Sequence, residues 1–233
     1  MAAQVKSRKR VQEHGEVFTN EREVNAMLDM VKQETERIDS RFLEPACGDG
    51  NFLAEVLRRK LDVVDSRYRR SPREWEKYCF VAVGSVYGVE LLHDNAAACR
   101  DRLYSIVEER YRRIAKKNPN PYFLDVIGFV LERNVLNGNA LSLKAVDEDG
   151  NDTGEPIIFS EWSVVAGDRV KRRDFRLDEM LEGNVERGQT RTLFGADMTS
   201  AVDWEYDEET KTFIPKPIRE FPLTSLYEVH RHD

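Results

Sequence analysis

The segment from Arg41 to Leu53, RFLEPACGDGNFL, constrains the fold of this chain more than any other part of the sequence. A short apolar pair and an acid precede a glycine-rich turn, and apolar residues then recur at helical spacing from Phe52 onward. This order is typical of a strand, a tight turn and a helix whose N-terminus faces the turn. Glycines there allow positive φ angles and a close approach of the backbone to a ligand. The segment therefore predicts a ligand-binding corner of an α/β domain, although the same pattern also fits a corner without a ligand.

The bulk properties of the chain predict a globular protein with a sizeable core. The sequence has 233 residues, of which 40% are hydrophobic and 34% are charged, and this length suits one substantial domain with appendages. No uninterrupted apolar run reaches membrane-spanning length, and the first residues lack the apolar region of a signal peptide. We therefore expect no membrane association.

The few cysteines and histidines bear on the cell compartment and on metals. Cys47, Cys79 and Cys99 show neither pairing nor metal-ligand spacing, which predicts a reducing cytoplasm. The chain has only four histidines, two of them among the last four residues, so we expect no metal site. A net charge of −7 argues against nonspecific polyanion binding by the whole surface, but local basic runs could still contact DNA.

A second apolar run ends at Val89 and Glu90 and is followed by a helical pattern. In doubly wound folds, an acid at the carboxyl end of the second parallel strand accepts hydrogen bonds from ribose hydroxyls. The order of the two segments therefore predicts that Glu90 lies beside the glycine turn and binds a nucleoside.

Together these segments resemble the S-adenosylmethionine-dependent N6-adenine DNA methyltransferases of bacterial restriction–modification systems. The segment Arg41–Leu53 resembles motif I of that family, and YGVELLHDNA resembles motif II. Val17-Phe18-Thr19 resembles motif X, with Asn20 in place of the usual proline, and VLNGNAL resembles motif III, with Asn139 in place of the usual aspartate. The resemblance covers about residues 17–162 in the family order X, I, II, III.

The resemblance implies a Rossmann-like α/β domain, here with a possibly truncated sheet, and S-adenosyl-L-methionine as the cofactor. It implies that adenine in DNA accepts the methyl group, that Glu90 binds the ribose, and that the carbonyl of Asn139 accepts the cofactor's adenine amino group. The cofactor-binding residues that follow from the resemblance are Phe18, Thr19, Glu44, Pro45, Ala46, Cys47, Gly48, Gly50, Asn51, Phe52, Glu90, Leu91, Asn139, Ala140 and Leu141.

The catalytic tetrad of the family, (Asn/Asp/Ser)-Pro-Pro-aromatic, has no intact counterpart in the sequence. At the end of the expected fourth strand the chain reads Phe159-Ser160-Glu161-Trp162, without either proline. The candidate catalytic residues are Ser160, Glu161 and Trp162, with Trp162 stacking on a flipped adenine. The earlier Asn118–Tyr122 segment, NPNPY, is interpreted as a helix stop and turn.

Basic residues suggest where DNA could bind. Arg169, Lys171, Arg172 and Arg173 lie on a predicted hairpin, where they would contact phosphates. The run from Lys6 to Arg10 fits either a solvated terminus or a phosphate-contacting arm.

The predicted organisation is a methyltransferase-like domain over residues 1–182 and a C-terminal extension over residues 183–233. The domain would contain a helical N-terminal motif at 17–36 and a charged segment at about 62–79, which fits a helical extension or a surface insertion. The cations and aromatic residues of this segment would suit nucleic acid, but it is interpreted as a solvated connector. The extension would pack on the domain or be partly irregular.

One functional hypothesis is an active adenine methyltransferase. The other is a non-catalytic or partner-dependent subunit that binds cofactor or DNA, acting with a specificity or restriction subunit. Methyl transfer to RNA or to a small molecule also stays open.

Overall fold

The computed structural model describes residues 19–116, 118–182, 204–207 and 212–232. The helices are α2 (Glu21–Met30), α3 (Lys32–Thr35), α4 (Asn51–Tyr68), α5 (Pro72–Gly84), α6 (His93–Ala115), α7 (Phe123–Asn134), α8 (Leu177–Glu182) and the 3₁₀ helix η1 (Leu226–Arg231). The strands are β1 (Phe42–Glu44), β2 (Val86–Glu90), β3 (Val135–Asn139), β4 (Lys144–Val146), β5 (Asp152–Pro156), β6 (Ile158–Ala166), β7 (Arg169–Arg176), β8 (Trp204–Asp207), β9 (Thr212–Pro215), β10 (Arg219–Glu220) and β11 (Thr224–Ser225).

The predicted strand–turn–helix corner belongs to a five-stranded sheet with the order β1-β2-β3-β4-β5. The first three strands are parallel, with Leu43 opposite Tyr87 and Gly88 opposite Val135, whereas β4 and β5 are antiparallel additions. The prediction of a mixed α/β fold with a parallel sheet is thus confirmed at this level. Within the described ranges no strand pairs with the outer side of β1, which is therefore an edge of this sheet.

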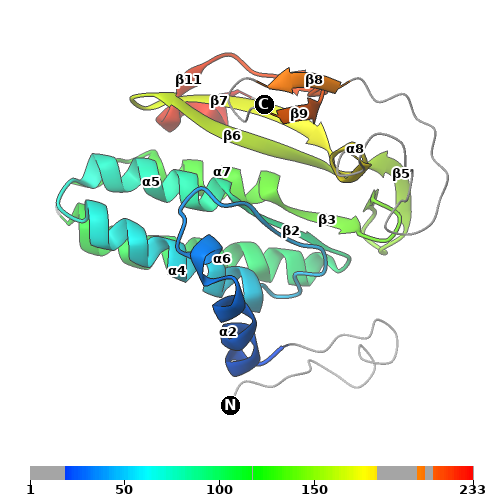
Figure 1. Ribbon diagram of the computed structural model, residues 1–233, viewed down its shortest axis with the longest axis horizontal. Coiled ribbons are helices and arrows are strands. Elements are labelled where there is room, and N and C mark those ends of the chain that lie inside the picture. Colours follow the sequence, from blue (N-terminus) through cyan, green and yellow to red (C-terminus); the bar gives the residue numbers. More distant parts are fainter. Residues whose placement is uncertain (1–18, 117, 183–203, 208–211, 233) are drawn as a thin grey trace.

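Four helices connect the parallel strands and form most of the core. Helices α4 and α5 lead from β1 to β2, and α6 and α7 lead from β2 to β3 (Figure 1). Trp75 is fully buried among them and stacks on Tyr111, with ring centroids 5.8 Å apart. Its indole N–H donates to Asp65 at the end of α4 over 2.6 Å. Residues 62–79 are therefore the end of one core helix and the start of the next, which agrees with the expected helical extension and corrects the interpretation as a solvated connector.

A second sheet lies over α5 and α7 (Figure 1). Its long hairpin consists of β6 and β7, and β10 and β11 pair with the other edge of β7. Trp162 of β6 packs against Phe80 of α5 and Phe129 of α7, with centroid distances of 5.9 and 6.1 Å. The residues from Arg219 onward thus add to this sheet and, through η1, to the core next to α7.

A buried lysine ties α4 to the segments that precede β1 and β2. Lys60 is fully buried, and its ammonium donates to the carbonyl of Ile38 at 3.1 Å, to the carbonyl of Ser40 and to the hydroxyl of Ser85 at 2.6 Å. Burial lowers the pKa of Lys60 to about 7, because removal from water disfavours the charged form. The three acceptors favour the ammonium and oppose this shift, so only part of the cost of burying the charge is offset.

This lysine predicts a pH-dependent stability. Between about pH 7 and the usual lysine pKa of 10.5 the unfolded chain binds more protons than the folded chain, so stability rises with pH. We expect the free energy of unfolding of the wild type, measured by urea denaturation, to rise over this window relative to that of Lys60→Met. The difference has an upper limit of about 1.4 kcal/mol per pH unit. Identical pH profiles for the two proteins would contradict a lowered pKa.

Candidate functional site

The turn between β1 and α4 has the backbone geometry that the glycines predict. Gly48 and Gly50 have φ angles of +54° and +86°, in the left-handed region. The N–H of Cys47 donates to the carbonyl of Val89 over 3.0 Å and that of Gly50 to Cys47 over 2.9 Å, so the turn is anchored to β2. A Cβ on Gly50 would lie 2.6 Å from the sulfur of Cys99 on α6. The second glycine is therefore required by close packing against α6 as well as by its φ angle.

The structure brings Glu90 to this turn. Its side chain is nearly buried, and Oε2 accepts a hydrogen bond from the N–H of Gly48 at 2.8 Å. Oε1 accepts from the N–H of Leu92 at 3.0 Å and from the amide of Asn95 at 3.4 Å. A carboxylate offers about four acceptor positions, so this one is fixed in orientation and retains capacity for a further donor such as a hydroxyl.

Two more acids beside the turn have carboxylate oxygens that can accept further hydrogen bonds. Glu44 ends β1, and burial raises its pKa, although a hydrogen bond from the N–H of Ala46 opposes the rise. Within the described part of the chain, no cation pairs with Glu44. Asp49 binds Arg102 through Oδ2 at 2.8 Å, whereas its buried Oδ1 has no hydrogen-bond partner there. Glu90 and Glu44 thus leave acceptor positions beside the turn that suit a ligand with hydroxyl and ammonium groups.

The other residues that the resemblance assigns to cofactor binding differ in their exposure to solvent. In the turn, Pro45 and Ala46 are exposed and Cys47 is buried. A hydrogen bond with Cys99, and then burial, raise the pKa of the Cys47 thiol, which keeps it neutral. Phe52 packs on the main core, whereas Ala140 packs on a smaller cluster around Tyr87 and Val89. Leu91 is half-buried and Leu141 is largely exposed.

The predicted N-terminal and third motifs also lie near this edge. Asn51 donates its amide to the carbonyl of Thr19 over 3.4 Å, and Asn20 caps α2 by accepting from the N–H of Glu23. Phe18 lies outside the described residues. Asn139 ends β3, next to β2, but its carbonyl accepts from the N–H of Leu141 and its amide donates to Asp152. The side-chain carbonyl of Asn139 is therefore already engaged in a local turn.

The candidate catalytic residues lie elsewhere. They belong to β6, which is not part of the parallel sheet, and each is held by its own partners. Ser160 donates to Asp174 over 2.7 Å, Glu161 accepts from Arg173 over 2.8 Å and pairs with Arg41, and the indole of Trp162 donates to Asn134 over 3.0 Å. The structure does not bring these side chains together with the glycine turn. As placed, they form a structural network.

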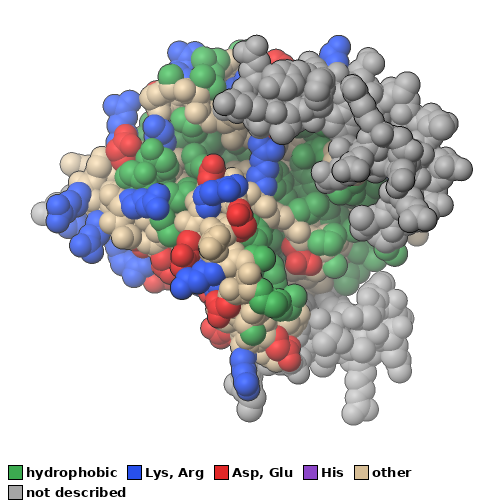
Figure 2. Space-filling model, in the orientation of Figure 1, with side chains coloured by type: hydrophobic (Ala, Val, Ile, Leu, Met, Phe, Trp, Pro, Cys, Tyr) green, Lys and Arg blue, Asp and Glu red, His purple; other side chains and the backbone are tan. Residues whose placement is uncertain are grey.

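The prediction that four basic residues of the hairpin contact DNA is wrong for two of them. Arg172 and Arg173 are buried, the first paired with Asp174 at 3.0 Å and packed on the ring of Phe221, the second paired with Glu161. Arg169 donates to the carbonyl of Leu223, and Lys171 lies 3.6 Å from Glu220. On the face drawn in Figure 2, basic and acidic side chains are interspersed. The contacts of Arg172 and Arg173 therefore stabilise the hairpin, whereas phosphate contact by Arg169 and Lys171 stays a prediction.

Sequence reasoning missed Arg102, which binds both Asp49 and Asn51 and so supports the turn from α6. The sequence gives only a weak indication of this role. Arg102 lies three residues after Cys99 and therefore on the same face of the helix.

Comparison of the chain with protein-family models, with curated proteins and with solved structures gives no match. None of the described helices is both long and apolar enough to cross a bilayer. The described residues also contain no cluster of three or more His, Cys, Asp or Glu side chains suited to holding a metal ion.

Proposed function

We propose that this chain is an S-adenosylmethionine-dependent methyltransferase that modifies the N6 amino group of adenine in DNA, on a Rossmann-like domain of restriction–modification type. The observation that carries the proposal is the hydrogen bond from the Gly48 N–H to the Glu90 carboxylate. It joins the glycine turn after β1 to the acid at the end of β2, at neighbouring carboxyl ends of parallel strands. Nucleotide ligands bind at this position in doubly wound folds.

The proposed roles of the residues follow from the hydrogen-bond acceptor positions that they leave unused. Glu90 would accept hydrogen bonds from the ribose hydroxyls, and Glu44 would pair with the amino group of the methionine part. The backbone of the turn would lie along the cofactor, with Thr19 beside it and with the carbonyl of Asn139 available after its local hydrogen bond breaks. The cofactor, when bound, supplies an activated methyl group on a sulfonium. The protein then has mainly to position the acceptor nitrogen in line with that group and to exclude water.

A second candidate function is a cofactor-binding subunit that methylates only with a partner, such as a specificity or restriction subunit. Two observations favour it. The residues Ser160 to Trp162 are held inside the β6–β7 network, and β1 is the edge of its sheet in the described residues. Doubly wound folds bind ligands between two halves of a sheet, and only one half is present here in the described ranges.

Transfer of a labelled methyl group to unmethylated DNA of mixed sequence, together with calorimetric titration of S-adenosylmethionine, separates these candidates. Incorporation at adenine by the full chain alone supports the first. Binding without incorporation favours the second. Absence of both would contradict both.

Glu90→Gln tests the site itself. The amide keeps the shape of the carboxylate but replaces one acceptor oxygen with a donor, which then faces the N–H groups of Gly48 or Leu92. We expect S-adenosylmethionine affinity to fall by about 1–3 kcal/mol, the usual cost of an unpaired buried polar group. Glu132→Gln, an exposed change on α7, is the matched control. Unchanged affinity in Glu90→Gln would remove the assignment of Glu90 to the ribose.

A further inference from the structure

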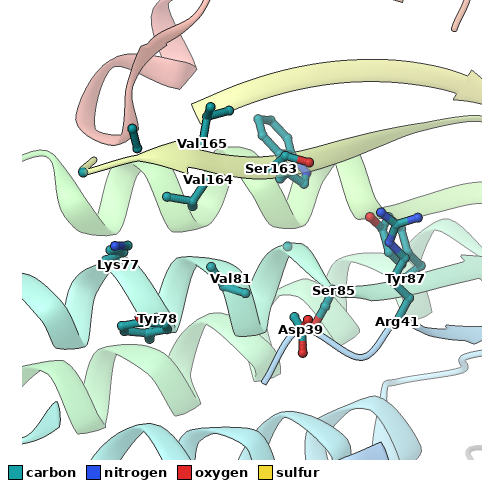
Figure 3. Close-up of a pocket in the computed structure, with 14 residues that line it drawn as sticks. Asp39, Arg41, Lys77, Tyr78, Val81, Ser85, Tyr87, Ser163, Val164 and Val165 are labelled. Carbon is teal, nitrogen blue, oxygen red and sulfur yellow. The ribbon is translucent and has the colours of Figure 1, made fainter. Parts of the chain in front are cut away.

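A pocket of about 540 Å³ lies at the opposite end of the parallel strands from the glycine turn. Its walls come from α5, from the segments that precede β1 and β2, and from the end of β6. Figure 3 shows Ser163, Val164 and Val165 of β6 on one side and Lys77 and Val81 of α5 on the other. The pocket is therefore a space between a strand and a helix, and the proposed methyltransferase site does not use it.

The strand that forms one wall has a free edge. β6 pairs with β7 on one side only, and within the described ranges no strand pairs with its other side. The carbonyl of Ser160 accepts from the hydroxyl of Tyr87 on β2, so it points away from β7. Because backbone direction alternates along an antiparallel strand, the N–H and carbonyl groups of Trp162 and Val164 also point away from β7. Both residues line the pocket.

The charges around the pocket favour an anionic occupant. Of the three charged residues in its lining, Asp39 pairs with Arg37, and Arg41 pairs with Glu161. Lys77 forms no ion pair with any described residue, and its ammonium lies over the ring of Tyr78 at 5.3 Å. Lys77 and Arg41 are at opposite ends of the pocket in Figure 3. A carboxylate that entered beside α5 would give Lys77 a counter-ion.

The apolar residues of the pocket suit alternating side chains. Val81 of α5 and Val164 of β6 are half-buried, and Val165 at the rim is 55% exposed. Successive side chains of an added strand point to opposite faces. An apolar residue could thus contact the valines while its acidic neighbours point toward the rim.

We propose that this pocket binds an extended, acidic segment of a partner protein, which adds as a strand to the free edge of β6. Strand addition of this kind takes its affinity from backbone hydrogen bonds and its selectivity from pockets for alternate side chains. The free groups of Trp162 and Val164 supply the hydrogen bonds, the valines supply the apolar contact, and Lys77 supplies the charge preference. This inference does not depend on the proposed methyltransferase activity.

The test uses the full chain and a fluorescein-labelled hexapeptide in which valine and glutamate alternate. Because backbone pairing tolerates many sequences, one such peptide is a sufficient probe. We expect a saturable rise in anisotropy and slowed amide hydrogen exchange at Trp162 and Val164 when the peptide is bound. Lys77→Glu should weaken binding by about tenfold or more through like-charge repulsion. Arg70→Glu changes the charge equally at an exposed position outside the pocket lining and should have no effect.

Four outcomes would overturn the proposal. The first is no saturable binding of the acidic peptide. The second is binding that leaves the exchange at Trp162 and Val164 unchanged. The third is a lack of selectivity for the acidic peptide, seen as equal affinity for a peptide with lysine in place of glutamate or as preferential binding of single-stranded oligothymidylate. The fourth is slowed exchange at these amides that depends on protein concentration without peptide, since the occupant would then be a second copy of the chain.

Discussion

Glu161→Gln is expected to lower the free energy of unfolding by about 3–5 kcal/mol, the range found when one partner of a buried ion pair is removed. Glu161 is 7% exposed on β6 and pairs with Arg173, which is 6% exposed, through a 2.5 Å contact. It also pairs with Arg41 in front of β1. The neutral amide would remove the charge that Glu161 places against the buried Arg173 and would loosen the contact between the two sheets. Urea denaturation with a fixed m-value measures the loss.

Glu155→Gln is the matched control, since Glu155 is exposed on β5. Its effect should stay within about 0.5 kcal/mol, as for most surface changes. This comparison also tests the candidate catalytic role of Glu161. Equal stability of the two variants, combined with a selective loss of methyl transfer in Glu161→Gln, would contradict the structural role and restore the catalytic one.

The corner around the glycine turn could be predicted from the sequence because its determinants are local. Positive φ angles call for glycine, and the N-cap asparagine of α2 precedes its helix directly. The meeting of Glu90 and Gly48 needs only one rule beyond these, that consecutive parallel strands place their carboxyl ends at one edge. Each of these inferences rests on residues close in sequence or on the adjacency of consecutive strands.

The buried charges of the second sheet could not be predicted in the same way. Arg172 and Arg173 read as a basic cluster because burial of an arginine depends on where its counter-ions lie. Glu161 is on the other strand of the hairpin, and its alignment with Arg173 depends on the register. Glu161, the one acid of β6, and Asp174, the one acid among the bases of β7, were available as a signal, but charge alone does not distinguish an ion-paired core from a phosphate-binding face.

Short strands and a high density of charged residues also hid secondary structure from the sequence analysis. β10 and β11 contain two residues each, too few to show an alternating pattern, so their pairing with β7 could not be read from the sequence. In residues 62–79 many charged side chains obscure the helical spacing of the apolar ones. Trp75, at the centre of the core, therefore looked like part of a solvated connector.

Gly50→Ala is expected to lower both the stability of the fold and the proposed affinity for S-adenosylmethionine. An alanine at a φ of +86° costs about 1–2 kcal/mol in backbone strain. Its Cβ would also lie 2.6 Å from the sulfur and 3.2 Å from the Cα of Cys99, inside the core contact between the turn and α6. Overpacking of this kind costs about 1–3 kcal/mol more. Displacement of the turn would move the N–H of Gly48 away from Glu90, so we expect cofactor binding to weaken at temperatures where the variant is still folded.

Gly154→Ala separates the two costs, because Gly154 has a φ of +89° but no atom within 4 Å of an added Cβ. It should show the backbone strain alone and leave cofactor affinity unchanged. Adding Cys99→Ala to Gly50→Ala removes the sulfur that the new methyl group meets, and should restore part of the stability and of the affinity. Thermal unfolding and calorimetric titration of the four proteins, wild type included, provide the comparison. Equal losses in Gly50→Ala and Gly154→Ala, with no recovery in the double variant, would mean that contact with α6 does not fix the turn. Support for the proposed cofactor site would then rest on the hydrogen bonds of Glu90 alone.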